Sequence, residues 1–337
     1  RERTTRRWLH HGEDILMRDA LGRVPVMIVT GFLGSGKTTL LNHLLTDGKL
    51  GRVAALVNDF GAINIDAALV GSMADEVVQL TNGCVCCTIN GDLLAAAERM
   101  LTVEPPIDHL IIETTGLADP LPIGLTFLQT GLRSRTSLDA VITVVDSANF
   151  ALDIFKSDAA MAQIVHGDVI VLNKTDLVGE EHLSLLERRM SLIKPRTRVL
   201  RASYGRIPHA VMVGGFGESS LASVSDPEPI NSPHLAKDDF AAHVLHFEGF
   251  LSAQLFQAWL DHAVPVGIFR AKGIIALDSP ERRFIFQLCG SRASFEPYAG
   301  PITDCQLVFI GQGIDGPALL AAVQSCVVRT KILTNTS

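Results

Sequence analysis

The sequence predicts an α/β protein in which a doubly wound, mostly parallel sheet is followed by a smaller α+β domain. Short apolar runs without alternation recur in the first two thirds of the chain, bounded by Gly, Pro, Asn or Asp. Helical patterns separate these runs, which is the rhythm of strands buried between two layers of helices. After residue 239 the core changes in kind, since nine of the 15 phenylalanines lie between Phe240 and Phe309.

The elements follow in chain order. Five buried strands are predicted at residues 24–30, 53–58, 109–113, 140–146 and 168–173. Helices are predicted between them at residues 37–50, 92–101 and 180–192. The last part reads as a strand at 241–247, a helix at 252–262, strands at 267–277, 283–289 and 306–310, and a helix at 316–326. This order predicts a mostly antiparallel sheet with two helices.

The domain boundaries follow from composition. Residues 1–23 are polar and of mixed charge, without an apolar secretion segment, and are expected to form a flexible arm. Residues 24–213 carry the parallel sheet. Residues 214–239 are rich in Gly, Ser, Pro, Asp and Glu, which is typical of an exposed linker. The C-terminal domain is expected at residues 240–330.

Composition excludes several classes of protein. The net charge of −7 over 337 residues argues against a nucleic-acid partner. Hydrophobic residues make up 47% of the chain, yet no uninterrupted apolar run reaches the ~18 residues of a membrane span. Six cysteines are too few for a disulfide framework. We therefore expect a cytoplasmic protein that contacts neither nucleic acid nor membrane.

The strongest motif follows the first strand. Residues 31–38 read GFLGSGKT and fit the phosphate-binding P-loop, in the required place between a strand and a helix. Its backbone N–H groups can surround phosphates, the Lys37 ammonium can reach the β- and γ-phosphates, and the Thr38 hydroxyl can bind Mg²⁺. The predicted nucleotide-binding residues here are Gly31, Gly34, Ser35, Gly36, Lys37, Thr38 and Thr39.

A second carboxylate is expected beside this loop. Glu113 ends the strand at 109–113 and is followed by Thr-Thr-Gly, so its carboxylate can hold Mg²⁺ together with Thr38. Gly116 can then offer its backbone N–H to the γ-phosphate and report whether that phosphate is present.

The base is predicted from residues 173–176, which read NKTD after the strand at 168–173. The Asp176 carboxylate can accept hydrogen bonds from both the N1–H and the exocyclic amine of guanine. The Lys174 stem can cover the ring of the base, and Asn173 can brace the loop. Adenine offers no such donor pair, so the tetrapeptide favours GTP over ATP.

A thiol cluster lies at Cys84, Cys86 and Cys87. Three thiolates at this spacing can converge on one ion and suit Zn²⁺, Cu⁺ or Co²⁺ better than Mg²⁺, with a fourth ligand from elsewhere. Buried small side chains or a redox pair are the alternatives. Asp59, just past a strand end, can reach Mg²⁺, a catalytic water or the thiolate-bound metal, or can simply form a turn. Cys289, Cys305 and Cys326 are expected in the core.

Together the segments GFLGSGKTTLLNHLL, NDFGAINID, GCVCCTINGDL, ETTGLADP and NKTDL resemble the CobW-type metallochaperone GTPases of the SIMIBI class. The resemblance implies a GTPase with Lys37, Glu113 and Asp59 in catalysis and with GTP, Mg²⁺ and Zn²⁺ or Co²⁺ bound. It also implies a client metalloprotein that receives the ion, and it leaves self-association into a homo-oligomer open. Many members carry Glu where Asp59 stands, and many carry a His-rich stretch where this chain has only His209 and His234, which argues against metal storage.

The hypothesis from sequence is that GTP·Mg²⁺ orders the segment around Asp59 and through it the thiolate loop, so that hydrolysis releases the ion. Binding linkage is reciprocal, so metal would tighten GTP binding by the same factor. Two alternatives stay open. One is a P-loop kinase or ATPase acting on a small molecule with structural cysteines, and the other is a GTP-dependent regulatory switch whose thiols sense redox state.

Overall fold

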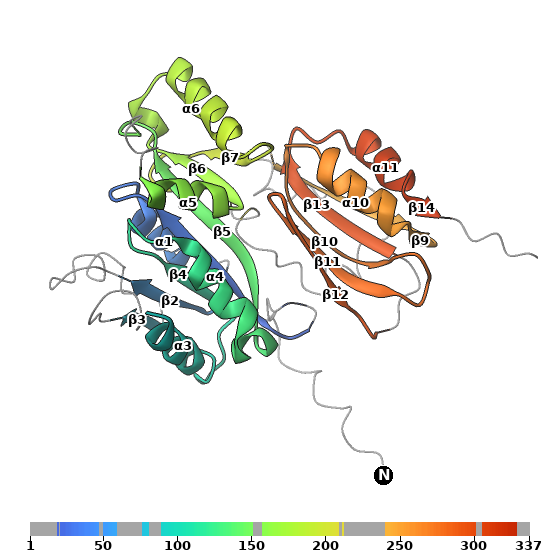
Figure 1. Cartoon of the computed structure of the whole chain (residues 1–337), viewed down its shortest axis with the longest axis horizontal. Helices are drawn as coiled ribbons and strands as arrows, with labels where there is room; N and C mark the ends of the chain where they lie inside the picture. The colour runs from blue at the N-terminus through green and yellow to red at the C-terminus, as the bar shows by residue number, and fades with distance from the viewer. Residues whose placement is uncertain are drawn as a thin grey trace, which may run out of the picture.

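Two sheets organise the molecule (Figure 1). A computed structural model describes residues 19, 21–46, 50–58, 76–80, 89–150, 157–208, 211, 240–300 and 305–328. The thiol cluster, Asp59 and the predicted linker lie outside these ranges, as do nearly all of the N-terminal arm and the last nine residues. Within the described ranges, no helix is both long and apolar enough to cross a membrane.

The first sheet has seven strands in the order β3-β2-β4-β1-β5-β6-β7, and every neighbouring pair is parallel. The strands are β1 (Val24–Gly31), β2 (Val53–Asn58), β3 (Glu76–Leu80), β4 (His109–Glu113), β5 (Thr136–Asp146), β6 (Val169–Asn173) and β7 (Arg198–Arg201). The helices are α1 (Lys37–Thr46), α3 (Ile89–Met100), α4 (Pro120–Gln129), α5 (Asp158–His166) and α6 (Glu180–Ile193), with short 3₁₀ turns η1 (Gly131–Ser134) and η3 (Thr175–Leu177).

The predicted fold class is confirmed, with differences in the bounds of some elements and with four strands and helices around the first sheet that were not predicted. All five predicted strands of the first sheet are present, and β5 begins four residues before the predicted 140. Helix α3 begins at Ile89 rather than at residue 92, and α1 is described to Thr46 against a predicted end at residue 50. Strands β3 and β7 and helices α4 and α5 were not predicted.

The second sheet has five antiparallel strands in the order β12-β11-β10-β13-β8. They are β8 (Phe240–Phe247), β10 (Ile268–Ala276), β11 (Arg283–Cys289), β12 (Arg292–Pro297) and β13 (Cys305–Gln312). Helices α10 (Ala253–His262) and α11 (Gly316–Gln324) accompany it, and β9 (Phe250–Leu251) pairs with β14 (Val327–Val328). The α+β reading of this part is confirmed, with β12 as an edge strand that was not predicted.

One hydrophobic cluster joins the two sheets. It contains Leu40 and Leu44 of α1, Val29 of β1, and Phe240 and Phe269 from the second sheet. The opposite face of the second sheet packs on α10 and α11 in a separate cluster built around Phe256, Phe286 and Phe309. The antiparallel sheet is therefore covered on both faces, by its own helices and by the parallel-sheet domain.

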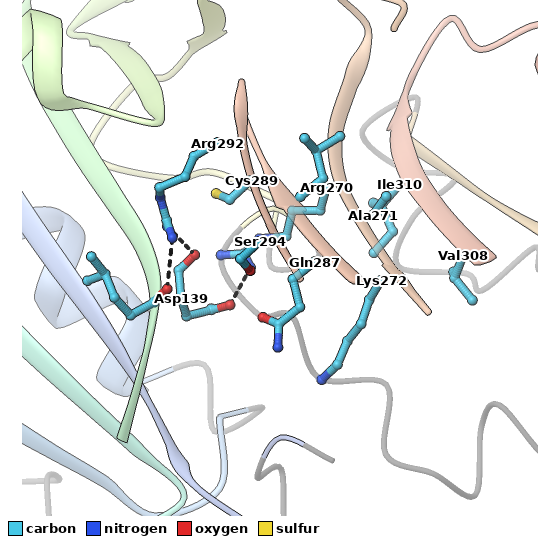
Figure 2. A pocket seen from close by; sticks show the side chains of 12 residues that line it. Asp139, Arg270, Ala271, Lys272, Gln287, Cys289, Arg292, Ser294, Val308 and Ile310 are labelled. Atoms are coloured by element: carbon cyan, nitrogen blue, oxygen red, sulfur yellow. Dashed lines mark hydrogen bonds and ion pairs between the residues drawn. The ribbon is translucent and has the colours of Figure 1, made fainter. Parts of the chain in front are cut away.

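Two ion pairs, one buried and one partly exposed, lie beside this shared cluster (Figure 2). The register of β1 against β5 passes from Leu138 to Ala140, so Asp139 is the extra residue of a β-bulge. Its Oδ1 lies 2.7 Å from Nη1 of Arg270 on β10, and both side chains are buried. Arg292 of β12 pairs with Asp168 at 2.7 Å and donates to the carbonyl of Asp139 at 2.9 Å. Figure 2 shows both guanidinium groups reaching toward the Asp139 segment.

Candidate functional site

The loop between β1 and α1 has the geometry of a phosphate-binding turn. Gly31, Gly34 and Gly36 have φ of 140°, 71° and 100°, a region that favours glycine. A Cβ at Gly36 would clash with the amide of Asn173. Helix α1 begins at Lys37, so its first N–H groups and its partial positive charge face the loop.

Lys37, Thr38 and Glu113 lie where the sequence predicts them, at the carboxyl ends of adjacent strands. The Lys37 Nζ donates to the carbonyl of Phe32 in its own loop, at 3.2 Å. The Thr38 hydroxyl donates to Oε1 of Glu113 at 2.8 Å. Glu113 is buried at the end of β4, opposite Val29 of β1. Parallel pairing of β1 with β4 therefore brings a hydroxyl and a carboxylate together, which is an oxygen donor set that Mg²⁺ prefers.

Two buried hydroxyls also face this region without satisfying their hydrogen-bonding capacity. In the described part of the chain, Ser35 Oγ and Thr115 Oγ1 are buried and have no hydrogen-bond partner. Leaving a buried donor unpaired is costly, and a ligand that accepts from both hydroxyls would remove this cost. Ser35 belongs to the predicted set, whereas Thr115 does not. Phosphate oxygens fit both groups as acceptors.

The turn after β4 packs against the phosphate loop. Thr114 donates its N–H to the carbonyl of Val29 at 2.9 Å and its hydroxyl to Thr30 Oγ1 at 2.9 Å. A Cβ built on Gly116 would lie 2.7 Å from the backbone N of Leu33. Gly116 is therefore held against the P-loop, at a distance that only glycine allows.

The NKTD segment is hydrogen-bonded to the phosphate loop and to the turn after β7. The buried Asn173 amide donates to the carbonyl of Ser35 at 2.9 Å, and its Oδ1 accepts the N–H of Gly205 at 3.0 Å. One side chain thus joins the phosphate loop to the turn after β7. Lys174 has φ of 61°, and its Nζ lies 2.6 Å from Oδ2 of Asp146.

Asp146 and the turn after β7 were not singled out from the sequence. Burial alone would raise the pKa of Asp146, but hydrogen bonds from Asn149 and Lys174 hold this pKa below its ordinary value. The carboxylate therefore stays charged and fixes the Lys174 stem. Tyr204 and Gly205 in this turn are consecutive left-handed residues with φ of 57° and 66°. Gly205 is therefore the signal in the sequence that could have indicated the turn.

Asp176 lies in the same segment as Asn173 and Lys174. It is exposed, at the first turn of η3, and the preceding Thr175 donates its hydroxyl to the carbonyl of Ala202 at 3.0 Å. The backbone of the loop is thus fixed while the Asp176 carboxylate remains accessible to a ligand. The fold brings together all the predicted nucleotide-binding residues at the carboxyl ends of the parallel strands.

The predicted metal ligands cannot be placed with the nucleotide residues. Cys84, Cys86, Cys87 and Asp59 lie outside the described residues. Among the residues that are described, no group of three or more His, Cys, Asp or Glu could hold a metal ion. The other cysteines, Cys289, Cys305 and Cys326, are buried free thiols, which confirms their predicted core position. Burial raises the pKa of Cys289 to about 12, so this thiol is unreactive.

Comparison with known proteins matches both parts of the chain. Residues 25–201 match the family model described as CobW/HypB/UreG, nucleotide-binding domain. Residues 240–327 match the model described as Cobalamin synthesis protein cobW C-terminal domain. The first matched range coincides with the parallel sheet, from β1 to β7, and the second with the part of the chain that begins at β8 and forms the antiparallel sheet.

Individual relatives extend over most of the chain. The sequence is 31% identical to the zinc chaperone CobW of a Sinorhizobium species, over 91% of this chain and 98% of that protein. It is 31% identical to zinc-regulated GTPase metalloprotein activator 1 of Schizosaccharomyces pombe, over 84% and 79% of the two chains. Among solved structures, the Zn(II)-bound YjiA GTPase of Escherichia coli is 25% identical and covers 91% of this chain, with a TM-score of 0.44.

Proposed function

Since this chain belongs to the CobW/HypB/UreG family, we propose that it is a GTP-hydrolysing metallochaperone that delivers zinc to a client protein. As a member of this family of GTPases, the chain is a P-loop GTPase. The observation that carries the proposal is the joined set of loops around Asn173, which connects the phosphate loop, the base-recognition segment and the turn after β7.

The phosphates and Mg²⁺ are assigned to the first loops. Backbone N–H groups from Gly34 to Thr39 surround the phosphates, and Lys37 exchanges its bond to the Phe32 carbonyl for phosphate oxygens. Thr38 and Glu113 supply oxygen ligands for Mg²⁺, and the hydrogen bond between them supports this pairing. Bound there, Mg²⁺ would neutralise charge developing on the transferred phosphoryl group. Asp59 is assigned to the catalytic water or to the metal shell.

Guanine is assigned to the NKTD segment. The Asp176 carboxylate accepts the N1–H and the exocyclic amine of the base, and the Lys174 stem covers its ring. Support comes from the fixed position of Lys174, which its ion pair with Asp146 holds at 2.6 Å. A site that satisfies two donors discriminates strongly against a base that lacks them.

Zinc is assigned to Cys84, Cys86 and Cys87, in keeping with the zinc chaperone names of the relatives and with the affinity of thiolates for Zn²⁺. Co²⁺ is a further ion that such a ligand set accepts. GTP binding tightens the thiolate site, hydrolysis loosens it, and a client metalloprotein receives the ion. By linkage, zinc tightens GTP binding by the same factor.

The test measures Zn²⁺ and Co²⁺ affinity of the full chain with a non-hydrolysable GTP analogue and with GDP. We expect tighter binding with the analogue and loss of the high-affinity ion in a variant with Cys84, Cys86 and Cys87 all replaced by Ser. Cys326→Ala is the matched control, because it removes a core thiol outside the cluster. Equal affinities in the two nucleotide states would overturn the switch.

The same preparation separates the alternatives. Competition between GTP and ATP for the site should favour GTP strongly, and a preference for ATP would instead support a kinase or ATPase. Unchanged zinc stoichiometry in the triple Cys variant would support a switch without cargo, whose thiols sense redox state.

A further inference from the structure

Gln163 of α5 touches the turn that follows β4. Its Nε2 donates to the carbonyl of Gly116 at 3.2 Å and to the carbonyl of Ala118 at 3.0 Å. The residue is 1% exposed, and no motif pointed to it. One buried amide therefore holds two carbonyls of a segment about 45 residues away in sequence.

The backbone of Gln163 is anchored independently of that turn. Thr143 of β5 donates its hydroxyl to the carbonyl of Gln163 at 2.6 Å, and Gly167 donates its N–H to the same carbonyl at 3.1 Å. Gly167 ends α5 in close contact with Thr143, where a Cβ would clash with the hydroxyl. The amide of Gln163 is thus presented from a fixed point on the sheet.

The turn is confined from its other side by the phosphate loop. Gly116 approaches the backbone N of Leu33 so closely that a side chain would not fit. Ala118 donates its N–H to the carbonyl of Thr115 at 3.2 Å, which closes the turn. Each residue has only two soft backbone rotations, so holding the carbonyls on both sides of Leu117 restricts the directions open to the Gly116 N–H.

A cavity lies beside Gln163 and the phosphate loop. Its volume is about 160 Å³, and it is lined by Gln163 and by Leu33 of the phosphate loop, with Phe150 and Ile164 among its apolar walls. Leu117, at the tip of the turn, is 55% exposed, so its side chain adds little packing and the hydrogen bonds of Gln163 hold this part of the turn.

We propose that Gln163 is the positioning residue of the γ-phosphate sensor, holding the Gly116 turn so that its N–H meets the γ-phosphate. This inference rests on the proposed binding of GTP at this site. Gln163 does not touch the nucleotide and acts through the turn alone. Its two hydrogen bonds select the GTP-bound arrangement, so their loss lowers affinity for GTP and leaves affinity for GDP unchanged.

The test compares the full chain with Gln163→Met, which keeps length and helix propensity but removes both donors. Dissociation constants are measured for a non-hydrolysable GTP analogue and for GDP. Two hydrogen bonds of ordinary net strength, about 1 kcal/mol each, correspond to about a 30-fold loss of analogue affinity. The GDP affinity should change less than about twofold, which corresponds to less than about half of one such bond.

Two further variants separate positioning from stability. Gln163→Asn keeps an amide but withdraws it by one methylene, and it should lose GTP preference in the same direction. Ser157→Ala removes the N-cap of α5, whose hydroxyl accepts the N–H of Ala160, and leaves the anchor of Gln163 and its two carbonyl partners unchanged. This control should lower the melting temperature and retain the ratio of GTP to GDP affinity.

The outcomes are distinct. A folded Gln163→Met or Gln163→Asn variant that keeps the wild-type ratio of GTP to GDP affinity overturns the inference. A fall of this ratio in Ser157→Ala as large as in Gln163→Met also overturns it, because the effect would then come from general loosening of α5. Failure of the proposed function has a separate signature, since the wild-type chain itself would then bind no GTP or prefer ATP.

Discussion

At the scale of single residues, the site depends on side chains that hold loops as much as on those that would touch a ligand. Asn173 bonds to Ser35 and Gly205, and Lys174 bonds to Asp146. These contacts fix the loops before a nucleotide arrives, which lowers the ordering cost of binding. The Asp176 side chain, to which we assign the base, remains exposed.

We expect Glu113→Gln to lower GTP hydrolysis by about 100-fold or more, because it removes a charged Mg²⁺ ligand at the reacting phosphate. The glutamine carbonyl still accepts the Thr38 hydroxyl, so the fold should remain intact. Single-turnover hydrolysis at varied Mg²⁺ measures the loss. Glu98→Gln on α3 is the control, and wild-type rates in Glu113→Gln would contradict the assignment.

Asp176→Asn should weaken GTP binding by ten- to 100-fold, since the amide replaces a double acceptor with a mixed donor and acceptor. The same change should improve binding of xanthosine triphosphate, whose base presents a carbonyl where guanine presents an amine. Competition binding with the two triphosphates measures the reversal. Loss of both affinities in parallel would show that Asp176 only supports the loop.

At the scale of elements, the strands of the two large sheets that escaped prediction are all edge strands. β3 and β7 are the two edges of the parallel sheet, and β12 is an edge of the antiparallel sheet. Edge strands carry polar and charged residues, as in RVLR and RASFEP, so they lack the continuous apolar signal of a central strand. Central strands are buried on both faces, and every one of them was found from sequence.

Helix α4 offers an element-scale test. Asp119 is its N-cap and accepts the N–H of Leu121 at 2.9 Å, with Pro120 at the first helical position. We expect Asp119→Ala to lower the free energy of unfolding by about 1 kcal/mol, because it leaves a helical N–H unpaired. Urea unfolding measures this change. Asp119→Ser is the control, since it restores a capping oxygen, and equal losses in both variants would exclude capping as the cause.

At the scale of the whole molecule, the two domains share a hydrophobic cluster and two ion pairs. Burial would raise the pKa of Asp139, but the Arg270 guanidinium outweighs it and holds this pKa below its ordinary value. Asp139→Ala leaves Arg270 buried without its carboxylate partner. We expect a loss of about 3–5 kcal/mol in the free energy of unfolding, measured by chemical denaturation.

The pH dependence follows from the lowered pKa of Asp139. The unfolded chain binds this proton at a higher pH than the folded chain does, so the stabilisation is fully present above about pH 4 and declines as pH falls below it. This acid-dependent component should disappear in Asp139→Ala. The control is Arg282→Ala, which breaks an exposed pair with Asp278 and should change stability by less than about 1 kcal/mol. Comparable losses in the two variants would contradict a special role for the buried pair.

The sequence alone determined the features that depend on neighbours along the chain. The P-loop, the strand-end Glu113 and the NKTD segment are short, because phosphate binding and base recognition use a few consecutive residues on one turn. The tertiary structure alone decided the contacts between distant segments. Gln163 meets Gly116, and the bulge at Asp139 meets Arg270, across separations of 47 and 131 residues. No local pattern encodes such pairs, because each partner is chosen by sheet order and packing, which arise only when the whole chain folds.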